Sequence, residues 1–171
     1  MIAIVKNTGL KWLWIAVLAL VLDQVTKLWI LAILKEGDII PVFQGFNIVL
    51  RYNPGAAFSF LADAGGWQRW FFTIIAAGVS VVLVGILYRL PLTERINGIA
   101  YSLVLGGAIG NLIDRLLYGK VVDFIDWYYG SYHWPAFNIA DSAICIGVVL
   151  LIIDMLFYAK KRELAGNVGD H

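Results

Sequence analysis

The sequence predicts an all-α membrane protein with four transmembrane helices, together with a small β-sheet and a short interfacial helix on its outer side. Composition is the first observation: 61% of the 171 residues are hydrophobic and 15% are charged, and the mean hydropathy is +0.80. Soluble domains carry about 25% charged and about 45–50% apolar residues. The second observation is that four segments have the roughly 20 mostly apolar residues that a membrane helix needs.

The four spans are predicted at about 10–34, 70–88, 96–117 and 138–158, with outer loops at about 35–69 and 118–137, in one domain covering residues 1–171. The first span follows Lys6 and Lys11 and so looks like a cleavable signal peptide. It is longer than a signal core and continues through Asp23 and Lys27 without a small-residue cleavage site. We therefore interpret it as a permanent anchor.

The distribution of cations predicts the orientation. Four spans place both termini and the middle loop on one side, which carries seven cations, and the other side carries five. Cytoplasmic loops are enriched in lysine and arginine, so we expect both termini in the cytoplasm. The seven are Lys6, Lys11, Arg89, Arg95, Lys160, Lys161 and Arg162, and the five are Lys35, Arg51, Arg69, Arg115 and Lys120.

The two outer loops carry different patterns. "FNIVLRYN", residues 46–53, alternates with the period of a strand, and a turn near Gln44–Gly45 connects it to "IIPVF". This pattern predicts a small hairpin or sheet. "FIDWYYGSYHW", residues 124–134, is aromatic and amphiphilic, so we expect a short interfacial helix or lid there.

Two charged residues lie inside the first span. Asp23 and Lys27 are four residues apart, so they share one helical face. Charges at membrane depth are expensive and normally face a partner or a cavity. The pair is either a mutual ion pair or part of a polar pocket near the outer leaflet, and the residues alone favour neither.

The third span ends in "LGGAIGNLIDR", residues 105–115. Its glycines allow neighbouring helices to approach closely. Its polar residues stand at i, i+3 and i+4, so they share a face that should point into the bundle. The glycines are Gly106, Gly107 and Gly110, and the polar residues are Asn111, Asp114 and Arg115.

Three acids, Asp123, Asp126 and Asp141, lie in the second outer loop and the start of the fourth span. Asn138 followed by Asp141 is a helix-start signature, in which a carboxylate is favoured by the helix dipole. Asp123 has no such explanation, because it follows "KVV" and precedes "FI" at the membrane surface. We interpret Asp126 as a solvated loop charge.

The predicted topology brings Asp123 and Asp141 to the same outer level. Two carboxylates held close share a proton, and one then activates water while the other protonates the substrate. This is aspartic-protease chemistry, which needs no metal, nucleophilic serine or cofactor. The helix start favours Asp141 as the more acidic member, so we expect Asp123 to hold the proton.

Other chemistries find little support. The net charge of +1 gives no reason to expect nucleic acid. The single cysteine, Cys145, lies in an apolar run without a histidine nearby in sequence, which disfavours a thiol nucleophile. The chain has only two histidines, His133 and His171, which disfavours a histidine-rich zinc site.

Ordered motifs among the four spans resemble bacterial lipoprotein signal peptidase, also called signal peptidase II. They are "LDQVTK", "NPGAAFSF", "LGGAIGNLIDRLLYGKVVDFID" and "PAFNIADSAI". The resemblance covers nearly the whole chain, and the ordered set is highly specific. It implies a bacterial inner-membrane aspartic peptidase, active near the outer (periplasmic) leaflet, that cleaves prolipoproteins before a diacylglyceryl-modified cysteine.

The resemblance also implies roles for single residues. The catalytic pair maps onto Asp123 and Asp141, and we expect a monomer whose partners are the prolipoprotein and membrane lipid. Expected substrate-binding positions are Asn53, Asn111, Arg115, Asn138, Asp23 and Lys27, and expected supporting positions are Asp114, Gly107 and Gly110.

Four alternatives remain open. A small transporter or proton pathway would also hold intramembrane Asp and Lys, although no inverted repeat is visible. A structural assembly factor would use the polar groups only for helix packing. An intramembrane aspartyl protease of another type would use "GxGD", which "GNLID" does not match. A metal-dependent hydrolase would be sensitive to chelators, and we expect no such sensitivity.

Overall fold

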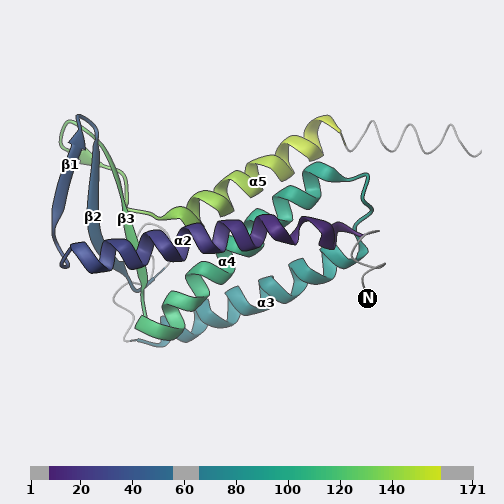
Figure 1. The fold of residues 1–171 in the computed structure, drawn as a ribbon, viewed down its shortest axis with the longest axis horizontal. Coiled ribbons are helices and arrows are strands. Elements are labelled where there is room, and N and C mark those ends of the chain that lie inside the picture. The colour runs from purple at the N-terminus through teal and green to yellow at the C-terminus, as the bar shows by residue number, and fades with distance from the viewer. Residues whose placement is uncertain (1–7, 56–65, 159–171) are drawn as a thin grey trace, which may run out of the picture.

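A computed structural model describes residues 8–55 and 66–158. It contains a bundle of long helices with a small β-sheet at one end (Figure 1). The start of the first long helix and the end of the last one lie at the opposite end of the bundle (Figure 1). Some features that entered the sequence argument lie outside the described residues: Lys6, Lys160, Lys161, Arg162 and the second half of "NPGAAFSF".

Within the described residues, four helices are long and apolar enough to cross a membrane, which confirms the prediction of four membrane helices. The first continues from a short 3-10 turn. The helices are η1 (Gly9–Trp12) leading into α2 (Leu13–Ile33), then α3 (Trp67–Arg89), α4 (Arg95–Tyr118) and α5 (Ile139–Phe157).

Large apolar side chains cover the outer faces of the bundle. Val25 and Leu28 of α2, Val81 of α3 and Met155 of α5 are all more than half exposed. Monomeric soluble proteins rarely expose apolar patches of this extent. The bundle surface is therefore suited to contact with lipid rather than water.

Helix α4 is the centre of the bundle, because it packs against each of the other three long helices. Its glycines allow this. A Cβ atom on Gly106 would lie 2.6 Å from the carbonyl oxygen of Ala16 in α2, and one on Gly107 would lie 2.3 Å from that of Ala140 in α5. Both distances are shorter than van der Waals contact, so α2 and α5 approach α4 as closely as only glycine permits.

This packing makes Gly107→Ala a destabilising change. The added methyl group would push the backbone of Ala140 away from α4, and overpacking of this kind costs about 1–3 kcal/mol. We expect a lower melting temperature in detergent and reduced activity, because α5 begins beside Ala140. Gly85→Ala in α3 is the matched control, since its Cβ meets nothing within 4 Å in the described structure. Equal melting temperatures for the two variants would contradict the close approach.

The sheet has four antiparallel strands in the order β1-β2-β3-β4. The predicted hairpin is confirmed: β1 and β2 are joined by a turn at Gln44–Gly45, where Gly45 has φ +96°. A positive φ is readily adopted by glycine. The strands are β1 (Ile39–Phe43), β2 (Phe46–Asn53), β3 (Val121–Tyr129) and β4 (Tyr132–His133).

The predicted interfacial helix in the loop at 118–137 is wrong, because this segment forms β3 and β4. Aromaticity favoured an interfacial helix, but "VVDFIDWYY" is also rich in the β-branched and aromatic residues that favour strands. The edge of β2 supplies backbone partners along the length of β3, from Phe46↔Trp127 to Asn53↔Val121. Pairing with β2 therefore determines the secondary structure of a segment whose local sequence pattern is compatible with either a helix or a strand.

The sheet is fixed to the bundle by a small apolar core. Ile30, near the end of α2, packs with Leu50 of β2 and with Val122 and Phe124 of β3. Gly119, with φ +76°, ends α4 in the left-handed conformation, and β3 begins two residues later. The start of β3 is thus held where α2 and α4 meet the sheet.

Candidate active site

Asp123 and Asp141 reach the same cavity from different elements. Asp123 lies on β3 and Asp141 in the first turn of α5, and both line a cavity of about 1360 Å³. Asn53, Asn111 and Arg115 line it as well. The structure therefore brings together five of the site residues predicted from sequence.

Asn138 connects the two acids. Its side-chain oxygen accepts a hydrogen bond from the backbone N–H of Asp141 at 2.9 Å, which makes it the N-cap of α5. Its side-chain nitrogen donates to Oδ1 of Asp123 at 2.7 Å and to the carbonyl of Val122 at 3.1 Å. One fully buried amide group therefore fixes β3 relative to the start of α5.

Asn111, on α4, holds the side chain of Asp141. Its Nδ2 donates to Oδ1 of Asp141 at 2.7 Å, while its Oδ1 accepts from Nζ of Lys27 at 3.1 Å. The carboxylate of Asp141 thus bonds to a neighbouring helix rather than serving only as a first-turn charge. The cap was predicted correctly, and the side chain of Asp141 has a further partner.

The environment of Asp123 favours its neutral form. Burial raises the pKa of Asp123 from 3.8 to about 8, and the nearby charge of Asp141 acts in the same direction. Hydrogen bonds from Asn53 and Asn138 and the charge of Lys27 oppose the shift. A carboxyl group with this pKa holds its proton at neutral pH, as a general acid requires.

The raised pKa of Asp123 has a consequence for stability. An unfolded aspartate loses its proton near pH 4, whereas folded Asp123 keeps it to about pH 8. The folded state therefore binds one more proton in this window, and stability falls as the pH rises through it. In Asp123→Asn this contribution is absent, so the variant's melting temperature relative to wild type should increase from pH 4 to pH 8. A constant difference across this range would contradict the raised pKa.

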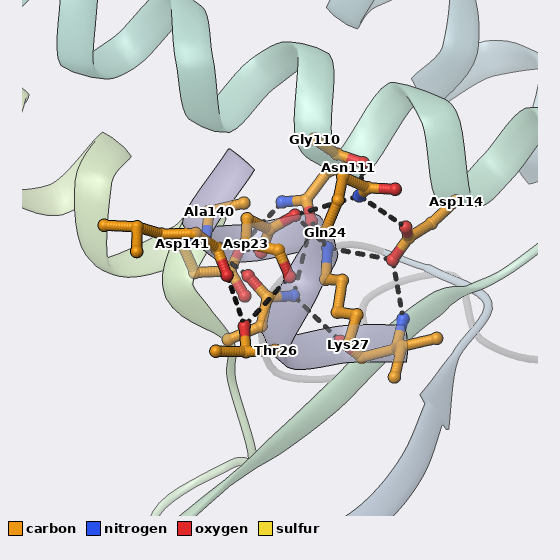
Figure 2. A network of polar contacts seen from close by, with 12 residues as sticks. Asp23, Gln24, Thr26, Lys27, Gly110, Asn111, Asp114, Ala140 and Asp141 are labelled. Carbon is orange, nitrogen blue, oxygen red and sulfur yellow. Dashed lines mark hydrogen bonds and ion pairs between the residues drawn. The ribbon is translucent and has the colours of Figure 1, made fainter. Parts of the chain in front are cut away.

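A buried charge network lies beside Asp141 (Figure 2). Nζ of Lys27 is 2.8 Å from Oδ2 of Asp23 and 2.9 Å from Oδ2 of Asp114, and all three side chains are at most 3% exposed. Gln24 donates to both carboxylates, at 3.1 Å to Asp23 and 3.2 Å to Asp114. The Asp23–Lys27 ion pair therefore extends across α2 and α4 rather than being confined to one helix.

Each carboxylate of this network also holds one active-site segment. Oδ1 of Asp23 accepts a hydrogen bond from the backbone N–H of Ala140 at 2.8 Å, in the first turn of α5. Oδ2 of Asp114 accepts from the N–H of Val122 at 3.0 Å, immediately before Asp123. Lys27 therefore links Asp23, which holds the helical turn that carries Asp141, to Asp114, which holds the strand that carries Asp123.

Three residues expected to bind substrate do not line the cavity. Asp23, Lys27 and Asn138 are almost fully enclosed and are absent from the cavity lining. Lys27 and Asn138 bond to residues that do line it. Asp23 and Asp114 instead hold Ala140 and Val122, which are next in sequence to lining residues, and the supporting residue Gly110 packs against Asp23. Their position is that of a layer supporting the cavity.

The interpretation of Asp126 as a solvated loop charge is wrong. Asp126 is on β3, is 6% exposed, and accepts a hydrogen bond from Asn47 of β2 at 2.8 Å. His133 lies 2.9 Å from its Oδ1. Because the sequence interpretation treated this segment as a loop, it could not predict Asn47 as a cross-strand partner of Asp126. Gln24 was also missed, although a polar residue between Asp23 and Lys27 within an apolar span was the available signal.

Comparison with known proteins gives consistent matches. A family model described as signal peptidase (SPase) II matches residues 15–157. A lipoprotein signal peptidase of Shigella boydii serotype 4 is 52% identical over 157 residues, which cover 92% of this chain and 96% of the relative. The corresponding protein of Escherichia fergusonii is 50% identical over the same coverage.

Solved structures agree with the fold. A bacterial membrane enzyme determined by the in meso method at 2.3 Å resolution is similar with a TM-score of 0.77 and 41% identity, over 85% of this chain and 87% of that one. A second, at 1.9 Å resolution, has a TM-score of 0.75 and 39% identity, over 87% and 94% of the two chains.

Proposed function

The chain belongs to the signal peptidase II family, and on this basis we propose that it is an aspartic endopeptidase that removes signal peptides from diacylglyceryl-modified prolipoproteins. Cleavage occurs immediately before the lipid-modified cysteine. The protein is a multi-pass protein of the bacterial inner membrane. The observation that carries the aspartic mechanism is that Asp123 and Asp141 border one cavity and are held by the same asparagine.

The proposed reaction uses the two acids in complementary states. Asp141, ionised, takes a proton from a water molecule whose oxygen attacks the carbonyl carbon of the scissile bond. Asp123, neutral, donates its proton to the carbonyl oxygen, which gives a neutral tetrahedral diol. Collapse of the diol breaks the C–N bond, the amine takes the proton held by Asp141, and one diol hydroxyl returns a proton to Asp123.

Arg115 and Asn53 are proposed to hold the substrate. Both line the cavity, and the Arg115 guanidinium donates to the backbone oxygens of Asn111 at 3.2 Å and Gly55 at 3.3 Å. A guanidinium presents five donors in a planar fork, which suits peptide carbonyls or lipid ester oxygens. Asn53 also hydrogen-bonds to Asp123, which supports a role for its side chain beside the reacting carbonyl.

The residues beneath the cavity are proposed to position the acids. Asn138 and Asn111 hold the carboxylates directly. Asp23, Lys27 and Asp114 hold the segments that carry them, and Gly107 and Gly110 let α5 and α2 approach α4.

We propose that residues 1–171 form one monomeric peptidase domain with both termini in the cytoplasm. The acids then lie near the outer leaflet, because the sheet and the start of α5 occupy the end of the bundle opposite to the start of α2 and the end of α5 (Figure 1). The reaction is proposed to need no metal or cofactor, and the protein is not expected to bind nucleic acid. The amide donors on both carboxylates and the neutral state of Asp123 support direct acid–base catalysis.

The test is cleavage of a prolipoprotein by the purified full-length protein in detergent or lipid. The diacylglyceryl-modified substrate should be cleaved before its cysteine, and the same polypeptide without lipid should be cleaved far more slowly. Addition of EDTA should leave the rate unchanged. Efficient cleavage of the unlipidated form would contradict the substrate assignment, and loss of activity with EDTA would contradict the metal-independent mechanism.

A further inference from the structure

The outer sheet contains a second pair of titratable side chains that the proposed reaction does not use. Nδ1 of His133, on β4, lies 2.9 Å from Oδ1 and 3.0 Å from Oδ2 of Asp126 on β3. The Asp126 side chain is 8% exposed and that of His133 is 51% exposed. Both residues line the cavity that also contains Asp123 and Asp141.

Asp126 connects three strands. Asn47 of β2, its direct cross-strand partner, donates Nδ2 to Oδ2 of Asp126 at 2.8 Å. His133 approaches the same carboxylate from β4, and its ring stacks on that of Tyr128 with centroids 5.1 Å apart and planes inclined at 19°. A buried carboxylate requires such partners, because leaving it unpaired is costly. The His133 ring is therefore held in one orientation.

His133 begins a continuous wall of the cavity. Residues 133–137, here called the cavity wall, all line the cavity and lead directly to Asn138. At one end, the N–H of Trp134 donates to the carbonyl of Trp127 at 2.7 Å. At the other end, Phe137 exchanges hydrogen bonds with Ile125 at 3.1 and 2.8 Å. Pro135, between these points, has no N–H to donate.

The end of the cavity wall at His133 has little backbone support. Strand β4 contains two residues, which pair as Tyr128↔His133 and Tyr129↔Tyr132. A ladder of two residues supplies few backbone hydrogen bonds, to which the bond between Trp134 and Trp127 adds one. The hydrogen bond between the His133 ring and a buried carboxylate therefore contributes a substantial part of what holds this end against β3.

We propose that Asp126 and His133 form a positioning pair that holds the cavity wall against β3 and so sets the width of the cavity beside the scissile bond. This inference rests on the proposed peptidase function for its effect on catalysis, though not for its effect on the cavity. Asp123 and Asp141 are held by Asn138 and Asn111, which the pair does not contact. Loss of the pair should therefore weaken substrate binding more than the chemical step.

The first measurement is steady-state cleavage of the lipidated prolipoprotein by full-length variants. His133→Ala should raise KM about tenfold or more, the effect of losing a hydrogen bond to a charged group, with kcat within about twofold of wild type. His133→Asn, which places an amide donor near the position of Nδ1, should restore most of the loss. Tyr132→Ala is the matched control, because Tyr132 lies in the same strand, is 66% exposed and is not among the residues that line the cavity.

The second measurement does not depend on catalysis. Cys145 is the only cysteine of the chain, is exposed and lines the same cavity. Without substrate, its reaction with a bulky maleimide should be faster in His133→Ala than in wild type, and unchanged in His133→Asn and Tyr132→Ala. If wild type failed to cleave the prolipoprotein, the proposed function would be wrong while the labelling rates would still test the pair.

The positioning role would be contradicted if His133→Ala folded and its Cys145 were labelled at the wild-type rate. It would also be contradicted if the kcat of this variant fell while its KM was unchanged. It is also contradicted if His133→Asn behaves like His133→Ala. Should His133→Ala fail to fold, Asp126→Asn removes the charge of the same contact with little change in shape. That variant is expected to raise KM and to speed Cys145 labelling, and wild-type values for both would overturn the proposal.

Discussion

Asp123→Asn and Asp141→Asn are each expected to abolish cleavage of the lipidated prolipoprotein, with losses of at least about 10²–10⁴-fold. Asp123→Asn removes the proton that the carbonyl oxygen receives, and Asp141→Asn removes the base that activates water. Each asparagine retains an oxygen that accepts from Asn138 or Asn111, the present partners of the carboxylates. The variants should therefore accumulate in the membrane as folded proteins, with activity and not abundance as the quantity that changes.

The comparison requires a matched acid away from the cavity. Asp38→Asn serves, because Asp38 is exposed and accepts a hydrogen bond from the N–H of Lys35 at 2.8 Å. This variant should cleave at the wild-type rate. If Asp141→Asn cleaved normally while Asp123→Asn did not, both the paired mechanism and the assignment of the proton to Asp123 would be wrong. Reduced abundance with normal turnover would instead support a purely structural role for the acids.

Lys27→Met is expected to cause the largest loss of stability among single changes in the bundle. The lysine ammonium lies within 2.9 Å of carboxylates on two helices, at 3% side-chain exposure. Methionine fits a similar volume but leaves Asp23 and Asp114 buried without their cation. Breaking a buried ion pair in this way costs about 3–5 kcal/mol. The measurement is the melting temperature of the purified protein in detergent.

The consequence should extend to catalysis, because Asp23 anchors the first turn of α5 and Asp114 anchors the start of β3. Lys35→Met is the control, since it makes the same chemical change at an exposed lysine and should leave both melting temperature and cleavage unchanged. A Lys27→Met protein that melted with the Lys35→Met control would show that the network does not support the fold.

The helices were predictable because the membrane imposes a strong and local requirement. A span must be long and apolar, so α3 (Trp67–Arg89) is visible in the sequence without knowledge of its neighbours. The polar face formed by Asn111, Asp114 and Arg115 was predictable for the same reason, since helical spacing fixes which side chains share a face. The partners of that face were not predictable, because they depend on how α2 and α5 pack against α4.

The outer segment was harder, because strand pairing is not local. Whether "VVDFIDWYY" becomes a strand depends on the edge of β2, which lies before α3 and α4 in the sequence, whereas this segment follows them. The error propagated to Asp126, whose burial follows from pairing with Asn47. The convergence of Asp123 and Asp141 on one cavity was predicted despite this error, because the expected topology placed both at the same outer level without requiring the intervening strand.

The position of Asn138 also determines when the active site is completed during synthesis. Its single amide group joins Asp123 to the first turn of α5, and α5 is the last of the four membrane helices in chain order. A nascent chain therefore carries Asp123 into the membrane before Asn138 and Asp141 have arrived. Under the proposed mechanism, proteolytic capacity is acquired only when α5 is inserted, because chains that end before it lack Asp141 and the asparagine that holds Asp123.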